Sequence, residues 1–141
     1  MVTCRGGTWL TQKISSGLIS LPAILINGQA AEQISVLDRG FQYGDGLFET
    51  LRVSAGKPRR WARHMARLAE GCQRLGIEMP EPELLLAEAK RLCTGKTEAV
   101  LKITITRGSS QRGYAPPSEA PVTRVLSLSD APVFPDAYYH E

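Results

Sequence analysis

Alternating apolar and polar residues predict several β-strands along the chain. Residues 100–107 place apolar side chains on one face and polar ones on the other, with Leu101, Ile103 and Ile105 opposite Lys102, Thr104 and Thr106. Residues 47–53 alternate in the same way. Both segments are therefore predicted strands, and we expect residues 124–128 to pair with 100–107.

Two dipeptides predict tight turns between short strands. Asn27-Gly28 suits the two positive φ angles of a tight hairpin, so residues 23–26 are expected to pair with 29–31. Ala55-Gly56 can turn residues 47–53 back into 57–61. The strands joined by such turns are antiparallel.

Apolar residues at spacings of three and four predict a helix over residues 62–75. One stripe contains Met65, Leu68, Cys72 and Leu75, and Gly76 is placed to end the helix. A second helix is predicted over residues 83–92, because Pro80 and Pro82 precede it and acidic residues crowd its N-terminal end. Strands, two helices and further strands predict an α+β domain with both helices packed on an antiparallel sheet.

The composition limits the classes of function. A chain of 141 residues with 43% hydrophobic content is long enough for one domain with a core. Its net charge is only +3 and the two signs are interspersed, so nucleic-acid binding is not expected. The densest basic cluster is Arg59, Arg60 and Arg63. We interpret it as a solvated surface, with an anion-binding rim as the alternative.

The termini and the cysteines suggest the setting of this domain. Residues 1–22 have no sustained period and are predicted to be a disordered extension, residues 23–131 the domain, and residues 132–141 a truncated linker. The apolar run 18–26 is too short to span a bilayer, so no membrane association is expected. Three cysteines in no metal-ligand spacing favour a reduced, cytoplasmic chain without a metal site.

A glycine-rich segment precedes the strand at residues 47–53. Residues 38–50 have the sequence DRGFQYGDGLFET, in which three glycines permit a loop of fixed shape and the aromatic residues supply packing area. Asp38 and Asp45 are interpreted as turn-formers whose side chains bond back to nearby backbone groups. The first helix then carries His64-Met65-Ala66-Arg67-Leu68.

Together these two motifs resemble the start of the fold-type IV pyridoxal-phosphate enzymes. That family includes branched-chain and D-amino-acid aminotransferases and the 4-amino-4-deoxychorismate lyases, to which the likeness is strongest. The resemblance covers residues 23–131 and implies the small N-terminal domain of such an enzyme. It also implies pyridoxal 5'-phosphate as cofactor and the conversion of 4-amino-4-deoxychorismate to 4-aminobenzoate and pyruvate, a step in folate biosynthesis.

The resemblance assigns roles to four residues. Arg67 matches the arginine of the H-x-x-R-L motif, which binds the cofactor phosphate, and a guanidinium fork suits phosphate oxygens. Arg112 and Tyr114 match a loop that reaches into the neighbouring subunit and holds the substrate carboxylate, which implies a homodimer. Phe48 stands where D-amino-acid aminotransferases have a tyrosine that helps to bind substrate, and so favours the lyase; packing in the core is the alternative for Phe48.

The resemblance also shows what this chain does not contain. The chemistry needs a lysine that holds the cofactor as a Schiff base, but none of the five lysines (Lys13, Lys57, Lys90, Lys96 and Lys102) lies in the family's lysine motif. In the family that lysine belongs to a second domain, expected to begin beyond residue 141. We therefore expect no catalytic residue here and no activity from the chain alone. An aminotransferase of the same fold type, and a non-catalytic remnant that only dimerises or binds a partner, are the alternatives.

Overall fold

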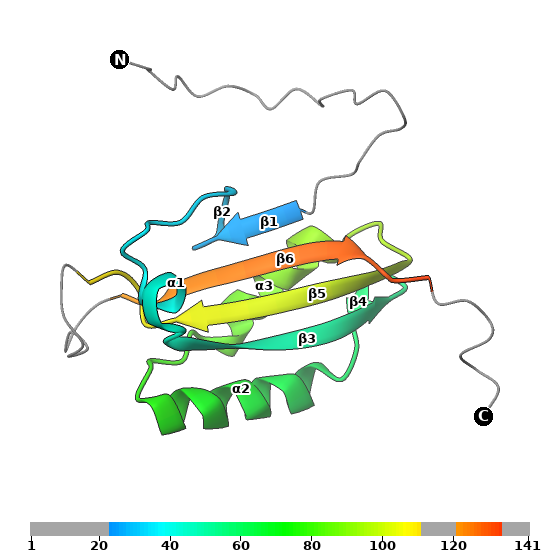
Figure 1. Cartoon of the computed structure of the whole chain (residues 1–141). Coiled ribbons are helices and arrows are strands. Elements are labelled where there is room, and N and C mark those ends of the chain that lie inside the picture. The colour runs from blue at the N-terminus through cyan, green and yellow to red at the C-terminus, as the bar shows by residue number, and fades with distance from the viewer. Residues whose placement is uncertain (1–22, 111–120, 134–141) are drawn as a thin grey trace, which may run out of the picture.

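One antiparallel sheet organises the computed structural model, which describes residues 23–110 and 121–133 (Figure 1). Its strand order is β2-β1-β6-β5-β3-β4. The strands are β1 (Ala23–Ile26), β2 (Gln29–Ala30), β3 (Gly46–Ser54), β4 (Lys57–Pro58), β5 (Glu98–Thr106) and β6 (Thr123–Asp130). The predicted α+β class is confirmed, while the predicted extension at residues 1–22 and most of the predicted linker lie outside the described residues.

Both predicted hairpins are present. Asn27 and Gly28 adopt φ angles of 50° and 81° between β1 and β2, and Ala55 and Gly56 adopt 50° and 73° between β3 and β4. The returning strand β4 is shorter than predicted and pairs only with Val53 and Ser54. Residues 46–52 of β3 therefore pair with β5 on one side and with no other described strand.

The long strands form the centre of the sheet. β3 pairs with β5 from Gly46↔Thr106 to Ser54↔Glu98. β5 pairs with β6 as predicted, from Ala99↔Asp130 to Thr106↔Thr123. On the other side of β6 lies β1, so the first described strand pairs with the last.

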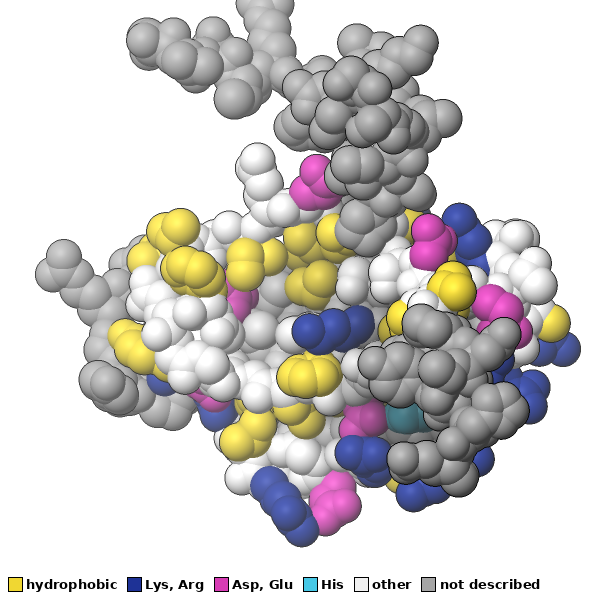
Figure 2. Space-filling model, turned by 45° about the vertical axis from the view of Figure 1, so that its right-hand side comes forward, with side chains coloured by type: hydrophobic (Ala, Val, Ile, Leu, Met, Phe, Trp, Pro, Cys, Tyr) yellow, Lys and Arg dark blue, Asp and Glu magenta, His cyan; other side chains and the backbone are white. Residues whose placement is uncertain are grey.

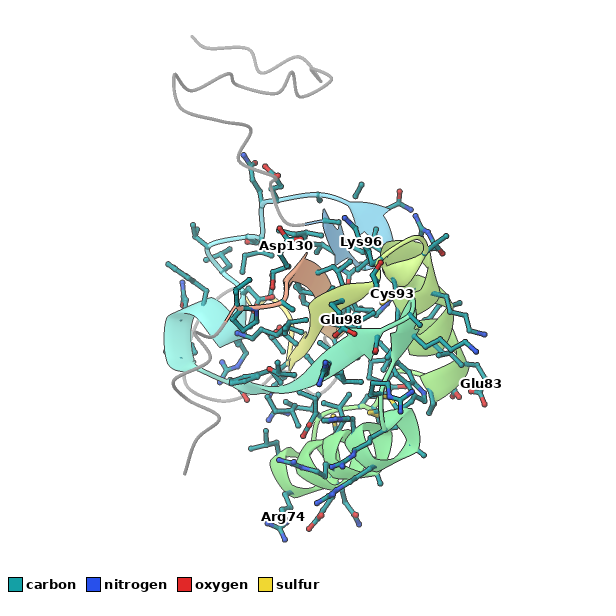
Figure 3. The ribbon with its side chains drawn as sticks, turned by 90° about the vertical axis from the view of Figure 1, so that its right-hand side faces the viewer. Arg74, Glu83, Cys93, Lys96, Glu98 and Asp130 are labelled. Carbon is teal, nitrogen blue, oxygen red and sulfur yellow. The ribbon has the colours of Figure 1, made fainter. Side chains whose placement is uncertain are left out.

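Two helices cover one face of this sheet, α2 (Trp61–Leu75) and α3 (Pro82–Cys93). In Figure 3 the labelled Arg74 and Glu83 point outward from these helices, whereas Cys93 lies on the side of α3 that faces the sheet. The buried core comprises side chains of β3, β5, β6, α2 and α3, among them Leu51, Leu68, Leu85, Leu101, Ile103 and Leu126. Burial of each such side chain contributes about 1.5–3 kcal/mol to folding.

The apolar stripe of α2 is shorter than predicted. Met65, Leu68 and Cys72 are buried, but Leu75 is 42% exposed. Leu75 is the last helical residue, and Gly76 ends the helix with a φ of 64°, as predicted. Ile77, just after the turn, takes the next buried position. None of the helices in the described ranges is long and apolar enough to cross a bilayer.

The glycine-rich segment contains a third helix, α1 (Arg39–Tyr43), which the sequence did not predict. Figure 1 places α1 at the end of the sheet where β5 ends and β6 begins. Asp38 caps its N-terminus and Gly44, with a φ of 65°, ends it. Because the residue that ends the helix, Gly44, follows the N-cap residue Asp38 so closely, the helix is only five residues long.

Candidate functional site

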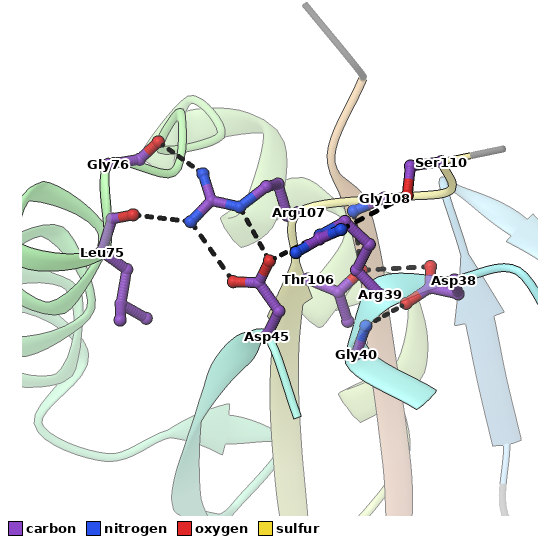
Figure 4. A network of polar contacts seen from close by, with 10 residues as sticks. All are labelled: Asp38, Arg39, Gly40, Asp45, Leu75, Gly76, Thr106, Arg107, Gly108 and Ser110. Carbon is purple, nitrogen blue, oxygen red and sulfur yellow. Dashed lines mark hydrogen bonds and ion pairs between the residues drawn. The ribbon is translucent and has the colours of Figure 1, made fainter. Parts of the chain in front are cut away.

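The motif glycines fix α1 against the sheet in two different ways. Of the motif glycines Gly40, Gly44 and Gly46, only Gly44 has a positive φ angle. A Cβ atom at Gly40 would collide with the side chain of Thr106, so Gly40 is needed for close approach. Asp38 joins the two segments, because its carboxylate accepts hydrogen bonds from Gly40 N at 2.8 Å and from Thr106 Oγ1 at 3.1 Å (Figure 4). Asp38 is thus the turn-former that was predicted, and it also anchors β5.

Asp45 makes a different set of contacts from the predicted one. Its carboxylate accepts hydrogen bonds from Arg39 Nε at 2.8 Å and from Arg107 Nε at 2.8 Å (Figure 4). Burial raises the pKa of Asp45, but the hydrogen bonds and charges of Arg107 and Arg39 outweigh burial and leave that pKa below its ordinary value. The prediction that the side chain of Asp45 bonds to nearby backbone groups is wrong, because its carboxylate accepts hydrogen bonds from two arginines instead.

Arg107 connects this cluster to the end of α2. Its guanidinium donates to the carbonyl oxygens of Leu75 at 2.6 Å and Gly76 at 2.9 Å. A cation at a helix C-terminus also interacts favourably with the helix dipole. We call Asp45, Arg39 and Arg107 the anchor cluster, since it ties α1, β5 and α2 together at one end of the sheet.

The anchor cluster also fixes the first residues after β5. Arg39 N donates to Gly108 O at 2.8 Å, and Gly108 N donates to Thr106 Oγ1 at 3.1 Å. These residues begin the segment that carries the predicted carboxylate-binding residues. Arg112 and Tyr114 themselves lie outside the described residues, so their roles stay predictions.

Arg67 belongs to a second cluster, on the rim between β3 and α2. Its Nε atom lies 3.2 Å from Oε1 of Glu49, while Oε2 of Glu49 lies 2.7 Å from Nδ1 of His64. We call Glu49, His64 and Arg67 the rim cluster. Glu49 is only 10% exposed at its side chain, whereas Arg67 is 63% exposed. Figure 2 shows acidic, basic and histidine side chains meeting on the surface of this side of the molecule.

The rim cluster suits a phosphate group chemically. An arginine anchored through Nε by a buried carboxylate keeps much of its surface open to solvent, and a guanidinium can donate two parallel hydrogen bonds to an anion. Sequence reasoning identified Arg67 but missed Glu49. One signal was available: Glu49 is in phase with the buried residues Leu51 and Val53 of the same strand.

Phe48 lies on the opposite face of β3 from Glu49. Phe48 is 60% exposed, so the alternative of a packed core residue is excluded for the described chain. Lys102 Nζ lies 4.3 Å from the ring centroid, in a cation–π arrangement on the sheet face opposite α2 and α3. Phe48 and Glu49 are adjacent in residues 46–52 of β3, which pair with β5 and with no other described strand. The Phe48 ring and the rim cluster therefore lie on opposite faces of the same part of β3.

The described lysines do not form an enclosed site. Lys57, Lys90, Lys96 and Lys102 are all exposed. No group of histidine, cysteine and acidic residues suited to a metal ion is found within residues 23–110 and 121–133. The described part presents an exposed arginine paired with a buried carboxylate, and an exposed sheet face.

The fold and the positions of its motifs define the small N-terminal domain of the fold-type IV enzymes. Residues 46–140 match the sequence profile of the amino-transferase class IV family, and the chain belongs to that family. The family comprises pyridoxal-phosphate-dependent aminotransferases and lyases. The predicted resemblance is thereby confirmed.

Similar proteins include both lyases and aminotransferases. The aminodeoxychorismate lyase of Vibrio harveyi is 33% identical over 105 residues, which cover 74% of this chain and 39% of the relative. The crystal structure of the 4-amino-4-deoxychorismate lyase from Pseudomonas aeruginosa superposes with a TM-score of 0.76 at 46% identity, covering 82% of this chain and 43% of that one. A D-alanine aminotransferase of Bacillus licheniformis is 30% identical over 98 residues, or 64% of this chain and 35% of the relative. The chain thus spans roughly two fifths of the length of these proteins.

Proposed function

We propose that this chain supplies the small domain of a 4-amino-4-deoxychorismate lyase. The observation that carries the proposal is the 46% identity to the Pseudomonas aeruginosa lyase over 82% of the chain. Such an enzyme converts 4-amino-4-deoxychorismate to 4-aminobenzoate and pyruvate, in the cytoplasm and as a homodimer. This chain would bind the cofactor phosphate and the substrate, not perform the chemical steps.

Arg67 is the proposed ligand of the cofactor phosphate. Its exposure at the rim and the ion pair of its Nε atom with Glu49 support that role, because a phosphate needs donors that are accessible. Bound pyridoxal phosphate supplies an electron sink for a carbanion. Its covalent attachment needs a lysine, which we assign to the portion of the relatives that this chain does not span.

Substrate binding is assigned to Arg112, Tyr114 and Phe48. Arg112 and Tyr114 would hold a substrate carboxylate through paired hydrogen bonds, and the anchor cluster fixes the chain shortly before them. Phe48 would line the site with an apolar ring on the exposed face. It cannot donate the hydrogen bond that a tyrosine would provide there.

The first experiment measures cofactor binding by the purified chain. We expect a protein incubated with pyridoxal phosphate, treated with borohydride and desalted to show no stoichiometric labelling of any lysine. Specific labelling would mean that one of the five lysines holds the cofactor, and the assignment of that lysine to another segment would be wrong.

The second experiment supplies the portion of the relatives that this chain does not span. The chain is co-expressed with residues of the Pseudomonas aeruginosa lyase that follow the matched region, and 4-aminobenzoate formation is measured. Arg67→Ala should weaken pyridoxal-phosphate affinity about tenfold or more, because a charge-assisted hydrogen bond contributes about 1.5–3 kcal/mol. Arg63→Ala, one helical turn earlier and also exposed, is the matched control and should leave affinity unchanged.

An aminotransferase is the second candidate, favoured by the 30% identity to a D-alanine aminotransferase. Activity assays of the co-expressed complex distinguish the lyase from the aminotransferase. Transfer of an amino group from D-alanine or a branched-chain amino acid to a keto acid, without release of 4-aminobenzoate from 4-amino-4-deoxychorismate, would establish the aminotransferase instead.

A further inference from the structure

We propose that Glu49 is a positioning residue that holds the guanidinium of Arg67 in the orientation required to bind a phosphate group. The inference rests on the proposed phosphate role of Arg67. It adds a residue that contacts neither cofactor nor substrate and acts through the arginine.

The geometry of the carboxylate supports this role. Among the described residues, each oxygen of Glu49 has one partner, with Oε1 facing Arg67 Nε at 3.2 Å and Oε2 facing His64 Nδ1 at 2.7 Å. The short contact to the largely buried His64 fixes the plane of the carboxylate. Because His64 and Arg67 are three residues apart on α2, both face β3, and the carboxylate lies between them.

Stability alone does not account for a carboxylate at this position. Glu49 lies on the helix-covered face of β3, where the next residues of the same phase, Leu51 and Val53, are fully buried. A buried carboxylate loses hydration, and a well-packed apolar residue often serves stability as well or better. An ion pair to an arginine as exposed as Arg67 contributes little to stability.

The arrangement has a clear benefit for anion binding. An arginine side chain loses rotamer freedom when it binds a ligand, and immobilising it beforehand reduces that cost. The ion pair of Arg67 with Glu49 is made at Nε, and the Arg67 side chain is 63% exposed despite it. Glu49 therefore orients Arg67 while its own negative charge is shared between two donors.

Replacement of Glu49 distinguishes positioning from simple electrostatics. Glu49→Gln removes a negative charge near the phosphate, so electrostatics alone predicts tighter binding. Loss of orientation predicts weaker binding, because the neutral amide no longer forms an ion pair with Arg67. We expect the affinity for pyridoxal phosphate to fall about fivefold to tenfold, consistent with the cost of immobilising one rotamer-rich side chain on binding.

The test uses the 141-residue chain, titrated with pyridoxal phosphate and separately with inorganic phosphate. The side-chain Nε–H signals of its arginines are followed by nuclear magnetic resonance. In the wild-type chain the Arg67 Nε–H signal should be sharp and should shift on addition of either anion. In Glu49→Gln it should broaden before any anion is added. Glu70→Gln, which breaks the exposed pair with Arg74 on the same helix, is the matched control and should leave the Arg67 signal and the affinity unchanged.

The outcomes separate the two proposals. If Arg67→Ala leaves the affinity for both anions unchanged, the phosphate role of Arg67 is wrong and the role of Glu49 falls with it. If Arg67→Ala weakens binding but Glu49→Gln binds as well as wild type or better, only the positioning role is overturned. Should Glu49→Gln fail to fold, Glu49→Asp replaces it, because the shorter carboxylate cannot reach both partners and should show the same broadening.

Discussion

The anchor cluster and the rim cluster use the same chemistry in opposite ways. In the anchor cluster the arginine side chains are only 5% and 16% exposed, and both guanidinium groups are directed at protein oxygens. In the rim cluster Glu49 is as buried as Asp45, but Arg67 is 63% exposed. Exposure of the cation, more than the presence of an ion pair, therefore separates an arginine that supports the fold from one that is available to a ligand.

This difference also separates stability from binding. Removal of one partner from a buried ion pair leaves an uncompensated charge and strongly destabilises the fold, whereas an exposed pair contributes little. Substitutions in the anchor cluster should therefore change mainly the free energy of unfolding. Substitutions in the rim cluster should change mainly anion affinity.

The largest effect is expected from Asp45→Asn. It leaves Arg39 and Arg107 facing each other without a carboxylate, and we expect the free energy of unfolding to fall by about 3 kcal/mol. Urea unfolding followed by circular dichroism measures the change. The control Glu70→Gln breaks an exposed pair and should lower stability by no more than about 0.5 kcal/mol. Equal effects of the two substitutions would contradict the distinction between the clusters.

The second largest effect on stability is expected from acid, which should weaken the anchor cluster. Because the folded-state pKa of Asp45 lies below its ordinary value of 3.8, its ionised form stabilises the folded chain above that pH. This contribution is lost as the pH falls from about 3.8 through the lower folded-state pKa. Stability measured at several pH values in this range should depend less on pH in Asp45→Asn than in wild type. Identical slopes would show that Asp45 is not the titrating group.

Arg67→Ala should have a small effect on stability. The side chain is 63% exposed, so we expect the free energy of unfolding to fall by less than about 1 kcal/mol. Arg39→Ala provides the comparison, because it removes a buried partner of Asp45 and should cost about 3 kcal/mol. The same urea unfolding assay measures both variants. A larger loss for Arg67→Ala than for Arg39→Ala would reverse the roles assigned to the clusters.

Phe48→Tyr should have the smallest effect on stability. The ring is 60% exposed, and an added hydroxyl on such a surface should change the free energy of unfolding by no more than about 0.5 kcal/mol. In the complex completed with the missing portion, the tyrosine should lower lyase activity relative to activity toward D-amino acids. An unchanged ratio of the two activities would show that Phe48 does not contribute to specificity.

The elements were predictable from the sequence because each has a local cause. Residues 100–107 alternate with a period of two, and the Gly76 stop signal follows a regular apolar stripe. The helix α1 was missed because its two capping residues, Asp38 and Gly44, enclose a segment too short to show a period. The exposure of Leu75 was missed because the spacing of a stripe does not show where the sheet beneath it ends.

The polar clusters were harder to predict because their members are distant in sequence. Asp45 and Arg107 are 62 residues apart, and no local pattern indicates that they meet. Thr106 was assigned to a polar face by alternation, yet it is buried because α1 covers the end of the sheet. Arg67 was identified only through the family motif, since its position off the apolar stripe is equally typical of a solvated helix residue.

The pairing of the first described strand with the last has a consequence for synthesis on the ribosome. Ala23 pairs with Leu128 and Ile26 with Val125, while the other described strand that pairs with β1 is the two-residue strand β2. A short isolated hairpin is marginally stable in water. The β1–β2 hairpin must therefore await the emergence of β6, after every other element of the sheet and both long helices have been made. A nascent chain stalled before residue 123 would expose Leu25 and the edge of β5, and would be prone to aggregate until translation resumed.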